Sequence, residues 1–312
     1  MKSCYTFIFV PIMLLGLTAC NEQNTSGHPE DEAGTNGELK SVEIRGETLH
    51  YLEQGTGEPI ILIHGAVGDY TAWGQQMDTL AQKYKVIAIS RRYAWPNRQP
   101  GPEDAFDCTV AQHAQDLIAF IRAMGLPSTH LIGHSYGAMI ALRTAIDYPE
   151  QVRSLVLGEP AMQNLISGTA LGDSLIAESK SSSDRAVQYY RAGHKDDAMR
   201  TFIKMVLGTA EVYDLVPQSW RDAWLRNLVE AICINETKDF YSIKREELKT
   251  MNLPTLLISG QSSPAILTLT IDSLHAILPN DVLNVLPNAS HGLQGENPQA
   301  FNDYVLRFLS AH

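Results

Sequence analysis

The sequence predicts an α/β protein with a mostly parallel, doubly wound sheet of about eight strands and one inserted helical segment. Three observations carry this prediction. Short apolar runs recur along the chain, helix-patterned stretches separate most of them, and the alternation stops once, between residues 161 and 251. Strands buried on both faces by crossover helices lack polar alternation, so this pattern is typical of a parallel sheet.

The elements are expected in a simple order. Segments 42–44 and 48–53, joined at Gly46, form a hairpin, and the unbroken apolar run Ile60–Ile63 forms the first buried strand. The remaining elements are a helix over 71–83, a strand over 86–89, a helix over 109–124, a strand over 130–132, a helix ending at Tyr148, strands over 154–157 and 254–258, a helix over 266–278, a strand over 282–285 and a helix over 298–309.

The interruption between residues 161 and 251 is charged and helix-patterned, which predicts a helical cap inserted into the sheet domain. We therefore divide the folded part of the chain into a core, 40–160 and 252–312, and a cap, 161–251. Trp220 and Trp224 lie at helical spacing in the cap. Packing is the commoner role for such residues, and substrate contact is the alternative.

The first twenty residues read as a signal peptide, because Lys2 is their single charge and the apolar stretch 7–17 is too short to span a bilayer. Their last four residues, Leu17-Thr18-Ala19-Cys20, resemble the bacterial lipobox. This resemblance implies lipidation of Cys20 and an anchor in the bacterial cell envelope, either on the outer membrane facing the periplasm or on the cell surface. Residues 21–39 are polar and acidic and predict a flexible linker.

Charge and motif content narrow the expected partners. The formal net charge is −11 and no basic cluster stands out, which argues against a nucleic-acid partner. No metal-ligand spacing occurs, and the glycine-rich turns lack a phosphate-loop lysine, so we expect no cofactor. The expected partners are a small-molecule substrate and, through the lipid anchor, a membrane.

Two cysteines remain in the folded part of the chain, Cys108 and Cys233, because Cys4 leaves with the signal peptide and Cys20 is the lipidation site. An oxidising compartment permits a disulfide between them. Their wide separation in the sequence gives no geometric support for one, so we expect two unpaired thiols.

Ser135 is the candidate nucleophile. It lies in Gly133-His134-Ser135-Tyr136-Gly137, directly after an apolar run and directly before a helix-patterned stretch. So sharp a strand-to-helix turn forces a positive φ on the serine and requires small residues on either side. G-x-S-x-G alone is a weak signal, and its position between a strand and a helix is what makes it informative.

A serine hydroxyl needs a base, and His291 is the candidate. It lies in a loop between the last expected strand and the last expected helix. Together with His64-Gly65 after a strand and the turn around Ser135, His291-Gly292 resembles the α/β-hydrolase fold family with an inserted cap. The resemblance covers the chain from about Val42 to its end. It implies an oxyanion hole formed by the backbone N–H groups of Ala66 and Tyr136.

The resemblance also implies an acid between Ser135 and His291 in the sequence. Many members of the family carry an aspartate after the strand expected at 255–259, but residues 260–264 contain no carboxylate. A subset of the family takes its acid from the end of the preceding strand, and Glu159 lies there. We expect Glu159 to be the acid, while Asp272 or an acid-free site remain alternatives.

These residues predict a serine hydrolase that cleaves a small, largely apolar ester or lactone-like substrate through an acyl-enzyme. C–C bond hydrolases, acyltransferases and cofactor-free haloperoxidases share the same residues and stay open. A non-catalytic binding lipoprotein on the same fold is the alternative of another class. Arg91, Arg92 and Trp95 are candidate substrate contacts, although structural ion pairs are the favoured reading of the two arginines.

Overall fold

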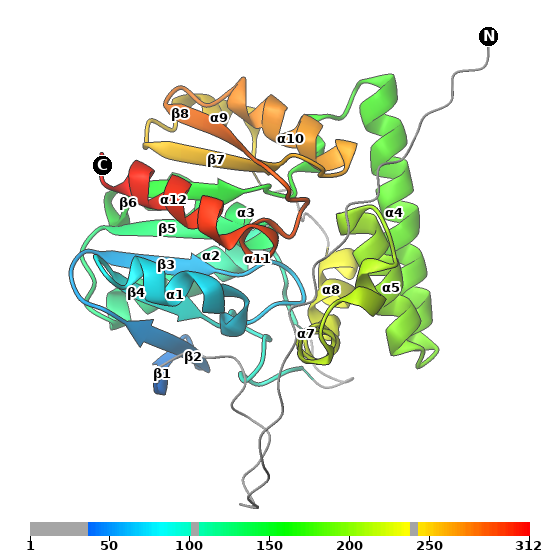
Figure 1. Cartoon of the computed structure of the whole chain (residues 1–312), viewed down its shortest axis with the longest axis horizontal. Coiled ribbons are helices and arrows are strands. Elements are labelled where there is room, and N and C mark those ends of the chain that lie inside the picture. Colours follow the sequence, from blue (N-terminus) through cyan, green and yellow to red (C-terminus); the bar gives the residue numbers. More distant parts are fainter. Residues whose placement is uncertain (1–36, 101–105, 238–242) are drawn as a thin grey trace, which may run out of the picture. The chain divides into compact units, whose positions relative to one another are not determined.

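The computed structural model in Figure 1 describes residues 37–100, 106–237 and 243–312. The expected signal peptide, Cys20 and residues 21–36 of the expected linker lie outside the described residues. Eight strands form one sheet in the order β1-β2-β4-β3-β5-β6-β7-β8, which confirms the predicted fold class. The strands are β1 (Leu39–Ile44), β2 (Glu47–Gln54), β3 (Pro59–Ile63), β4 (Lys85–Ile89), β5 (Thr129–His134), β6 (Val152–Gly158), β7 (Thr255–Gly260) and β8 (Asp281–Leu286).

The sheet is parallel from β4 to β8, while β2 pairs antiparallel with both β1 and β4. Every residue of β3 is buried, as the unbroken apolar run predicts. Because parallel strands end at one edge of a sheet, the residues that follow β3, β5, β6 and β7 gather there.

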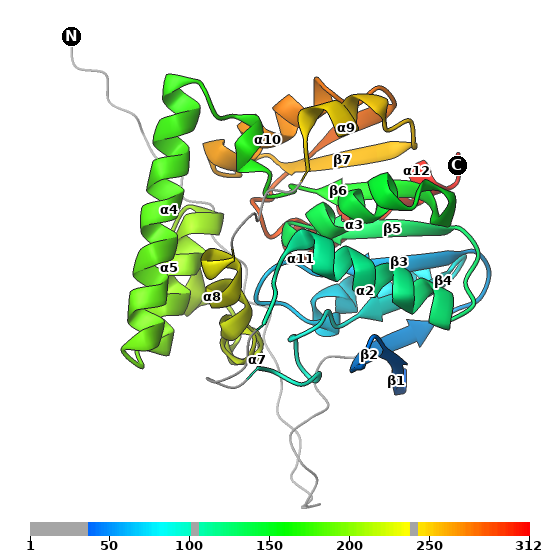
Figure 2. The same ribbon diagram turned by 180° about the vertical axis from the view of Figure 1, so that it is seen from behind.

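Helices cover both faces of the sheet (Figures 1 and 2). One face packs against α1 (Gly74–Leu80), α11 (Leu293–Glu296) and α12 (Pro298–Leu309). The other packs against α2 (Val110–Ala123), α3 (Tyr136–Asp147), α9 (Arg245–Thr250) and α10 (Ala265–His275). Three short 3₁₀ helices are η1 (Tyr70–Trp73), η2 (Pro149–Gln151) and η3 (Gln163–Leu165). The two apolar layers hold the strand ends in fixed relative positions.

Five further helices follow β6 and lie beyond the carboxyl ends of the strands (Figure 1). They are α4 (Ala170–Arg191), α5 (Lys195–Leu207), α6 (Val212–Leu215), α7 (Gln218–Arg226) and α8 (Leu228–Glu236). From here on, the word cap means these five helices, because α9, which falls within the range 161–251 predicted for the cap, packs on the sheet. Within the described ranges, no helix has the length and apolar character needed to cross a membrane.

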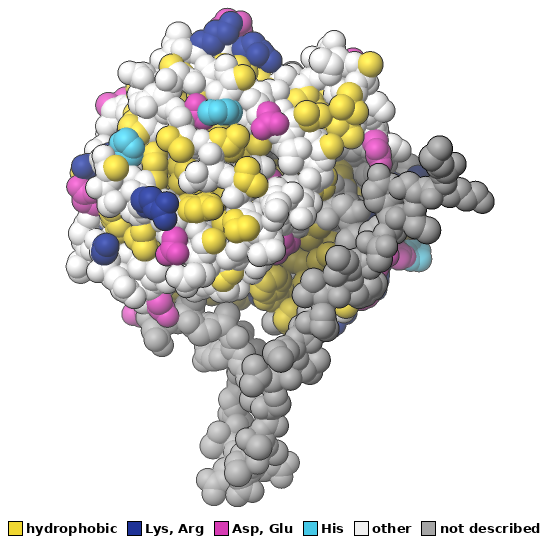
Figure 3. Space-filling model, turned by 45° about the horizontal axis from the view of Figure 1, so that its top comes forward, with side chains coloured by type: hydrophobic (Ala, Val, Ile, Leu, Met, Phe, Trp, Pro, Cys, Tyr) yellow, Lys and Arg dark blue, Asp and Glu magenta, His cyan; other side chains and the backbone are white. Residues whose placement is uncertain are grey.

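Strand β8 lies at one edge of the sheet. Its side chains Val282 and Val285 are 54% and 53% exposed. In Figure 3 this side of the molecule comes forward, and hydrophobic side chains are interspersed with charged ones there.

Cys108 and Cys233 form a disulfide, so the expectation of two unpaired thiols is wrong. Their Cα atoms are 5.9 Å apart although 125 residues separate them in the sequence. The bridge ties the segment before α2 to α8 of the cap. No local pattern in the sequence indicates this pairing, because it depends on where the cap returns to the core.

Removing the disulfide should destabilise the protein, because the bridge closes a long loop in the unfolded chain. For the double variant Cys108→Ala/Cys233→Ala we expect the free energy of unfolding to fall by about 2–5 kcal/mol. Chemical denaturation followed by tryptophan fluorescence measures it. Reductant should lower the unfolding midpoint of the wild type and leave that of the double variant unchanged; a wild-type midpoint insensitive to reductant would contradict the bridge.

Candidate active site

Ser135 lies at the turn between β5 and α3, with φ of 53°. The two flanking glycines leave no room for a side chain. A Cβ on Gly137 would lie 2.2 Å from the carbonyl oxygen of Ile63, and one on Gly133 would lie 2.5 Å from that of Gly137. The turn therefore has the positive φ and the small neighbours that a sharp strand-to-helix bend requires.

The ends of three strands meet around this serine. The Ser135 backbone N–H donates a hydrogen bond of 2.7 Å to the carbonyl oxygen of Gly158, the last residue of β6. On the other side, a Cβ built on Gly65, just after β3, would lie 3.2 Å from the Ser135 Cβ. Ser135 thus lies between the loop that begins at His64 and the residue that precedes Glu159.

His291 and Glu159 are joined by a buried hydrogen bond of 2.7 Å between His291 Nδ1 and Glu159 Oε2. The exposed fractions of the two residues are 5% and 0%. The His291 ring lies beside that of His134, with 4.7 Å between their centroids, and His134 Nε2 lies 2.7 Å from the His291 carbonyl oxygen. The fold thus brings His291 against the residue that precedes Ser135.

His134 is suited to a structural role. Since a carbonyl oxygen only accepts, we assign the proton of its ring to Nε2, which donates to His291. Burial, and the neighbouring His291, lower the pKa of His134 to about 3. A neutral His134 adds no charge beside the His291–Glu159 pair.

Glu159 is held by donors from β7 as well as by His291. Its Oε1 accepts hydrogen bonds from the Gly260 backbone N–H at 2.8 Å and from the Ser259 hydroxyl at 3.1 Å. Burial raises the pKa of Glu159, but the hydrogen bond and charge of His291 and the Gly260 N–H outweigh burial, and the pKa is lowered. The carboxylate therefore stays ionised at neutral pH.

Asp272, the alternative acid, and Asp281, which begins the strand after the helix of Asp272, both lie elsewhere. Asp272 is an exposed residue of α10, and the Asp281 carboxylate lies 2.7 Å from His275 Nδ1 at the start of β8. The structure thus places Glu159 beside His291, and it places neither aspartate there.

The two residues predicted for the oxyanion hole flank Ser135. Ala66 follows Gly65, whose backbone lies against the serine. Tyr136 is the first residue of α3, so its N–H is one of the donors at the positive end of the helix dipole. Both residues lie at the carboxyl edge of the sheet.

Arg91 and Arg92 form structural ion pairs, which was the favoured reading of them, and the structure does not bear out the other reading, that they contact a substrate. Arg91 Nη1 lies 2.6 Å from Glu230 Oε1, and Arg92 Nε lies 2.6 Å from Asp116 Oδ2. All four residues are buried. The charge of each arginine is already balanced by an acid inside the protein, which leaves neither available to a substrate carboxylate.

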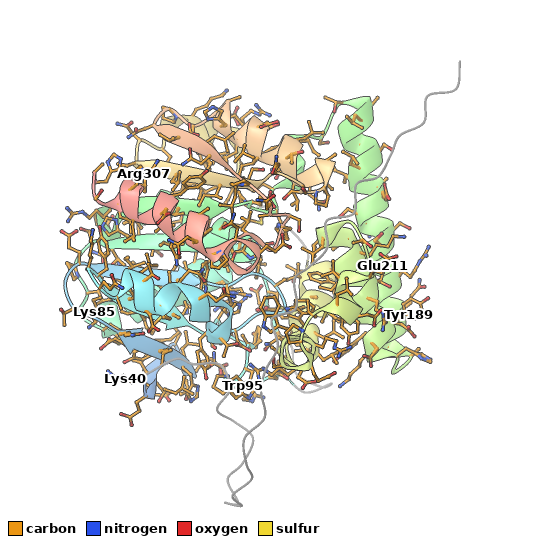
Figure 4. The ribbon with its side chains drawn as sticks, in the orientation of Figure 1. Lys40, Lys85, Trp95, Tyr189, Glu211 and Arg307 are labelled. Atoms are coloured by element: carbon orange, nitrogen blue, oxygen red, sulfur yellow. A yellow bond between two sulfur atoms is a disulfide. The ribbon has the colours of Figure 1, made fainter. Side chains whose placement is uncertain are left out.

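The three tryptophans considered as substrate contacts differ in their surroundings. Trp95, labelled in Figure 4, lies with the Arg226 guanidinium 3.9 Å from its ring centroid. Trp224 packs in the cap with its ring centroid 6.5 Å from that of Tyr213. Trp220 is 39% exposed, and its Cη2 atom is 3.4 Å from where a Cβ on Gly295 would lie. Trp220 therefore contacts α11, the short helix that directly follows the loop carrying His291.

Sequence reasoning missed the polar residues that join the cap to the core. Glu230 pairs with Arg91, and Asn227 Nδ2 donates to Asp69 Oδ2 at 2.8 Å. Asp69 also accepts from Arg226, through Nη2 at 2.8 Å. One local signal was present, because Glu230 is a lone charge within the otherwise apolar stretch 228–233. An isolated buried acid of this kind requires a cationic partner.

The chain belongs to the α/β-hydrolase fold family, whose model matches residues 58–298. It is 28% identical to a 2-hydroxy-6-oxononadienedioate/2-hydroxy-6-oxononatrienedioate hydrolase of Burkholderia vietnamiensis, over 84% of this chain and 90% of that protein. It is 23% identical to a 2-(acetamidomethylene)succinate hydrolase of Mesorhizobium japonicum, over 87% and 95% of the two chains. The family and the names of these relatives support a hydrolase.

Solved structures show the same fold. A carboxylesterase from Bacillus subtilis superposes with a TM-score of 0.68 at 22% identity, covering 90% of this chain and 94% of that one. A thermophilic esterase from Thermogutta terrifontis gives 0.70 at 20% identity, covering 88% and 98%.

Proposed function

We propose that the protein is a serine hydrolase with Ser135 as nucleophile, His291 as general base and Glu159 as the acid that orients the base. The observation that carries this proposal is the buried hydrogen bond between His291 and Glu159, placed beside the turn that presents Ser135. A carboxylate on Nδ1 leaves Nε2 of the imidazole as the atom that takes up a proton.

The mechanism follows from these positions. His291 removes the Ser135 proton as the serine oxygen attacks a carbonyl carbon, and the ionised Glu159 stabilises the imidazolium that forms. The N–H groups of Ala66 and Tyr136 stabilise the oxyanion. His291 then protonates the leaving group, and a water molecule activated by the same imidazole releases the acyl group from Ser135.

For the substrate we propose a small, largely apolar ester or lactone. Two features support an uncharged substrate. Arg91 and Arg92 are each paired with a buried acid, and the partly exposed indole of Trp220 lies next to α11. An apolar wall and a few polar groups at the reacting atoms are typical of small-molecule sites.

C–C bond hydrolysis of a dicarboxylate is the second candidate, and the observation that favours it is the similarity to the Burkholderia hydrolase, whose name gives a nonadienedioate. Such a substrate carries two carboxylates, which would need cationic partners. Because Arg91 and Arg92, the two arginines considered as substrate contacts, are already paired with acids, we place this candidate second.

We also propose that Cys20 is lipidated and anchors the protein in the bacterial cell envelope. The lipobox-like residues before Cys20 support this, as does the Cys108–Cys233 disulfide, because structural disulfides persist in oxidising compartments. A lipid anchor would hold the enzyme at a membrane surface while the folded domain remains in the aqueous phase.

Labelling with a fluorophosphonate tests the nucleophile. We expect the probe to modify Ser135 in the folded protein, because an activated serine attacks phosphorus as it attacks a carbonyl carbon. Mass spectrometry of the labelled peptide locates the modification, and Ser135→Ala should abolish it. An unlabelled folded wild type would instead favour a non-catalytic binding protein. Rates on p-nitrophenyl esters of varied length, lactones and a C–C cleavage substrate then rank the substrate classes.

Glu159→Gln should lower kcat by about a thousandfold or more, because the amide neither stabilises the imidazolium nor enforces the required tautomer. The matched control is Asp272→Asn, which alters an exposed acid of α10 and should keep full activity. Steady-state kinetics on the best ester, with circular dichroism to establish folding, make the comparison. A folded Glu159→Gln variant with near wild-type kcat would remove Glu159 from the mechanism.

Cys20→Ser should move the protein from the membrane fraction to the soluble fraction of an expressing bacterium, because the acyl chains have no other attachment site. Cys4→Ser is the control, since it alters a residue of the expected signal peptide and keeps the lipobox. Immunoblots of the two fractions report the outcome. Equal distribution of both variants and the wild type would contradict lipidation at Cys20.

A further inference from the structure

The Arg91 guanidinium connects the cap to the loop that follows β3. Nε donates to the His64 carbonyl oxygen at 3.0 Å, and Nη2 donates to the Gly65 carbonyl oxygen at 2.9 Å. On its other side, Nη1 and Nη2 donate to the two carboxylate oxygens of Glu230 in α8, at 2.6 and 2.7 Å. The exposed fractions of the two side chains are 2% and 0%.

These contacts fix the orientation of the Ala66 N–H. The carbonyl of Gly65 and the N–H of Ala66 belong to one planar peptide unit, so the direction of one sets the direction of the other. His64 adds a further constraint: its Nε2 accepts from the Arg91 backbone N–H, which leaves Nδ1, 2.9 Å from the Gly65 oxygen, to carry the proton and donate.

The next peptide unit is also held by the cap. Val67 has φ of 56°, an unusual value for a β-branched residue, and its backbone N–H faces the Glu230 carboxylate. Its side chain is buried in a cluster of cap residues: Ala198, Met199, Ile203, Tyr213 and Leu228. The strained backbone at Val67 thus persists because cap side chains surround it.

Helix α8 itself is fixed to the core on either side of Glu230. Cys233, one turn further along the helix, is bonded to Cys108, whose carbonyl oxygen accepts a hydrogen bond of 2.5 Å from the Tyr136 hydroxyl. Asn227, just before the helix, accepts a hydrogen bond of 2.8 Å from the Trp95 backbone N–H. The carboxylate of Glu230 therefore has a defined position relative to the sheet.

We propose that Glu230 of the cap is a positioning residue for the oxyanion hole, acting through Arg91 on the peptide unit that carries the Ala66 N–H. This inference rests on the proposed function, because it assigns a task to a donor of that reaction. A buried ion pair is a poor source of stability compared with apolar packing, whereas it can specify one arrangement of its surroundings. Here the specified arrangement is that of an N–H group used in the transition state.

Glu230→Gln tests the proposal. The variant removes the charge that holds Arg91, so the Gly65–Ala66 peptide loses its fixed orientation. Because an oxyanion donor acts in the transition state, we expect kcat to fall by about ten- to a hundredfold while KM changes by less than about threefold. Affinity for a trifluoromethyl ketone, which forms an oxyanion on Ser135, should fall in parallel with kcat. A purely structural role would leave both quantities unchanged in the protein that remains folded.

Asp116→Asn is the matched control, since it breaks the neighbouring buried pair with Arg92, which makes no contact with the Gly65 carbonyl. We expect it to lower stability and to leave kcat within about twofold of the wild type, as for independent sites. If Glu230→Gln does not fold, Arg91→Lys decides the question, because lysine keeps a cation opposite Glu230 but cannot bind both carbonyls. It should show the same selective loss of kcat.

The outcomes separate this inference from the proposed function. If the folded wild type is not labelled at Ser135 by a fluorophosphonate, the proposed function is wrong and the inference falls with it. If Ser135 is labelled and a folded Glu230→Gln or Arg91→Lys variant keeps the kcat of the Asp116→Asn control, the inference alone is wrong.

Discussion

The geometry of the whole site depends on how closely the start of α3 packs against the end of β3. At Gly137 the two backbones approach so closely that even a methyl group would overlap the carbonyl oxygens of Ile63 and His64. This approach forces the sharp turn at Ser135 and brings the serine against Gly65 on one side and Gly158 on the other. A larger residue at Gly137 would separate the two strand ends that the proposed nucleophile and oxyanion loop require.

The position of the acid follows from the same strand ends. The loop after β7, residues 260–264, contains no carboxylate, but the Gly260 N–H and the Ser259 hydroxyl remain there as donors. Glu159, with φ of 42°, turns from the end of β6 toward those donors, and its side chain reaches both them and His291. Strand β7 thus supplies hydrogen bonds to an acid that the neighbouring strand carries, which keeps a fully buried carboxylate charged.

The sequence predicts well those features that depend on local pattern. The buried strand Ile60–Ile63 follows from an unbroken apolar run, and the Ser135 turn follows from glycines at fixed offsets. Glu159 could be singled out because it directly follows a strand. Ion pairs were the favoured reading of Arg91 and Arg92, but the acids that bind them could not be identified, since these lie 139 and 24 residues away. The sequence around an arginine that pairs with the cap does not differ from the sequence around one that binds a substrate.

On these proposals, two helices of the cap have different tasks: α8 positions a backbone N–H of the oxyanion hole, and α7 contacts the substrate. Helix α8 is bonded to the core through Cys233 and Glu230, and on the proposed coupling it acts on the orientation of the Ala66 N–H, hence on the rate of the chemical step. Helix α7 places the partly exposed Trp220 against α11, which follows the loop that carries His291, and on the proposed function this indole acts on substrate fit. On this proposal, substitutions of Trp220 change specificity while α8 holds the Ala66 N–H, because Trp220 contacts α11 whereas Glu230 contacts Arg91. The cap could not position the Ala66 N–H if it moved as a rigid lid, because each opening would separate Glu230 from Arg91.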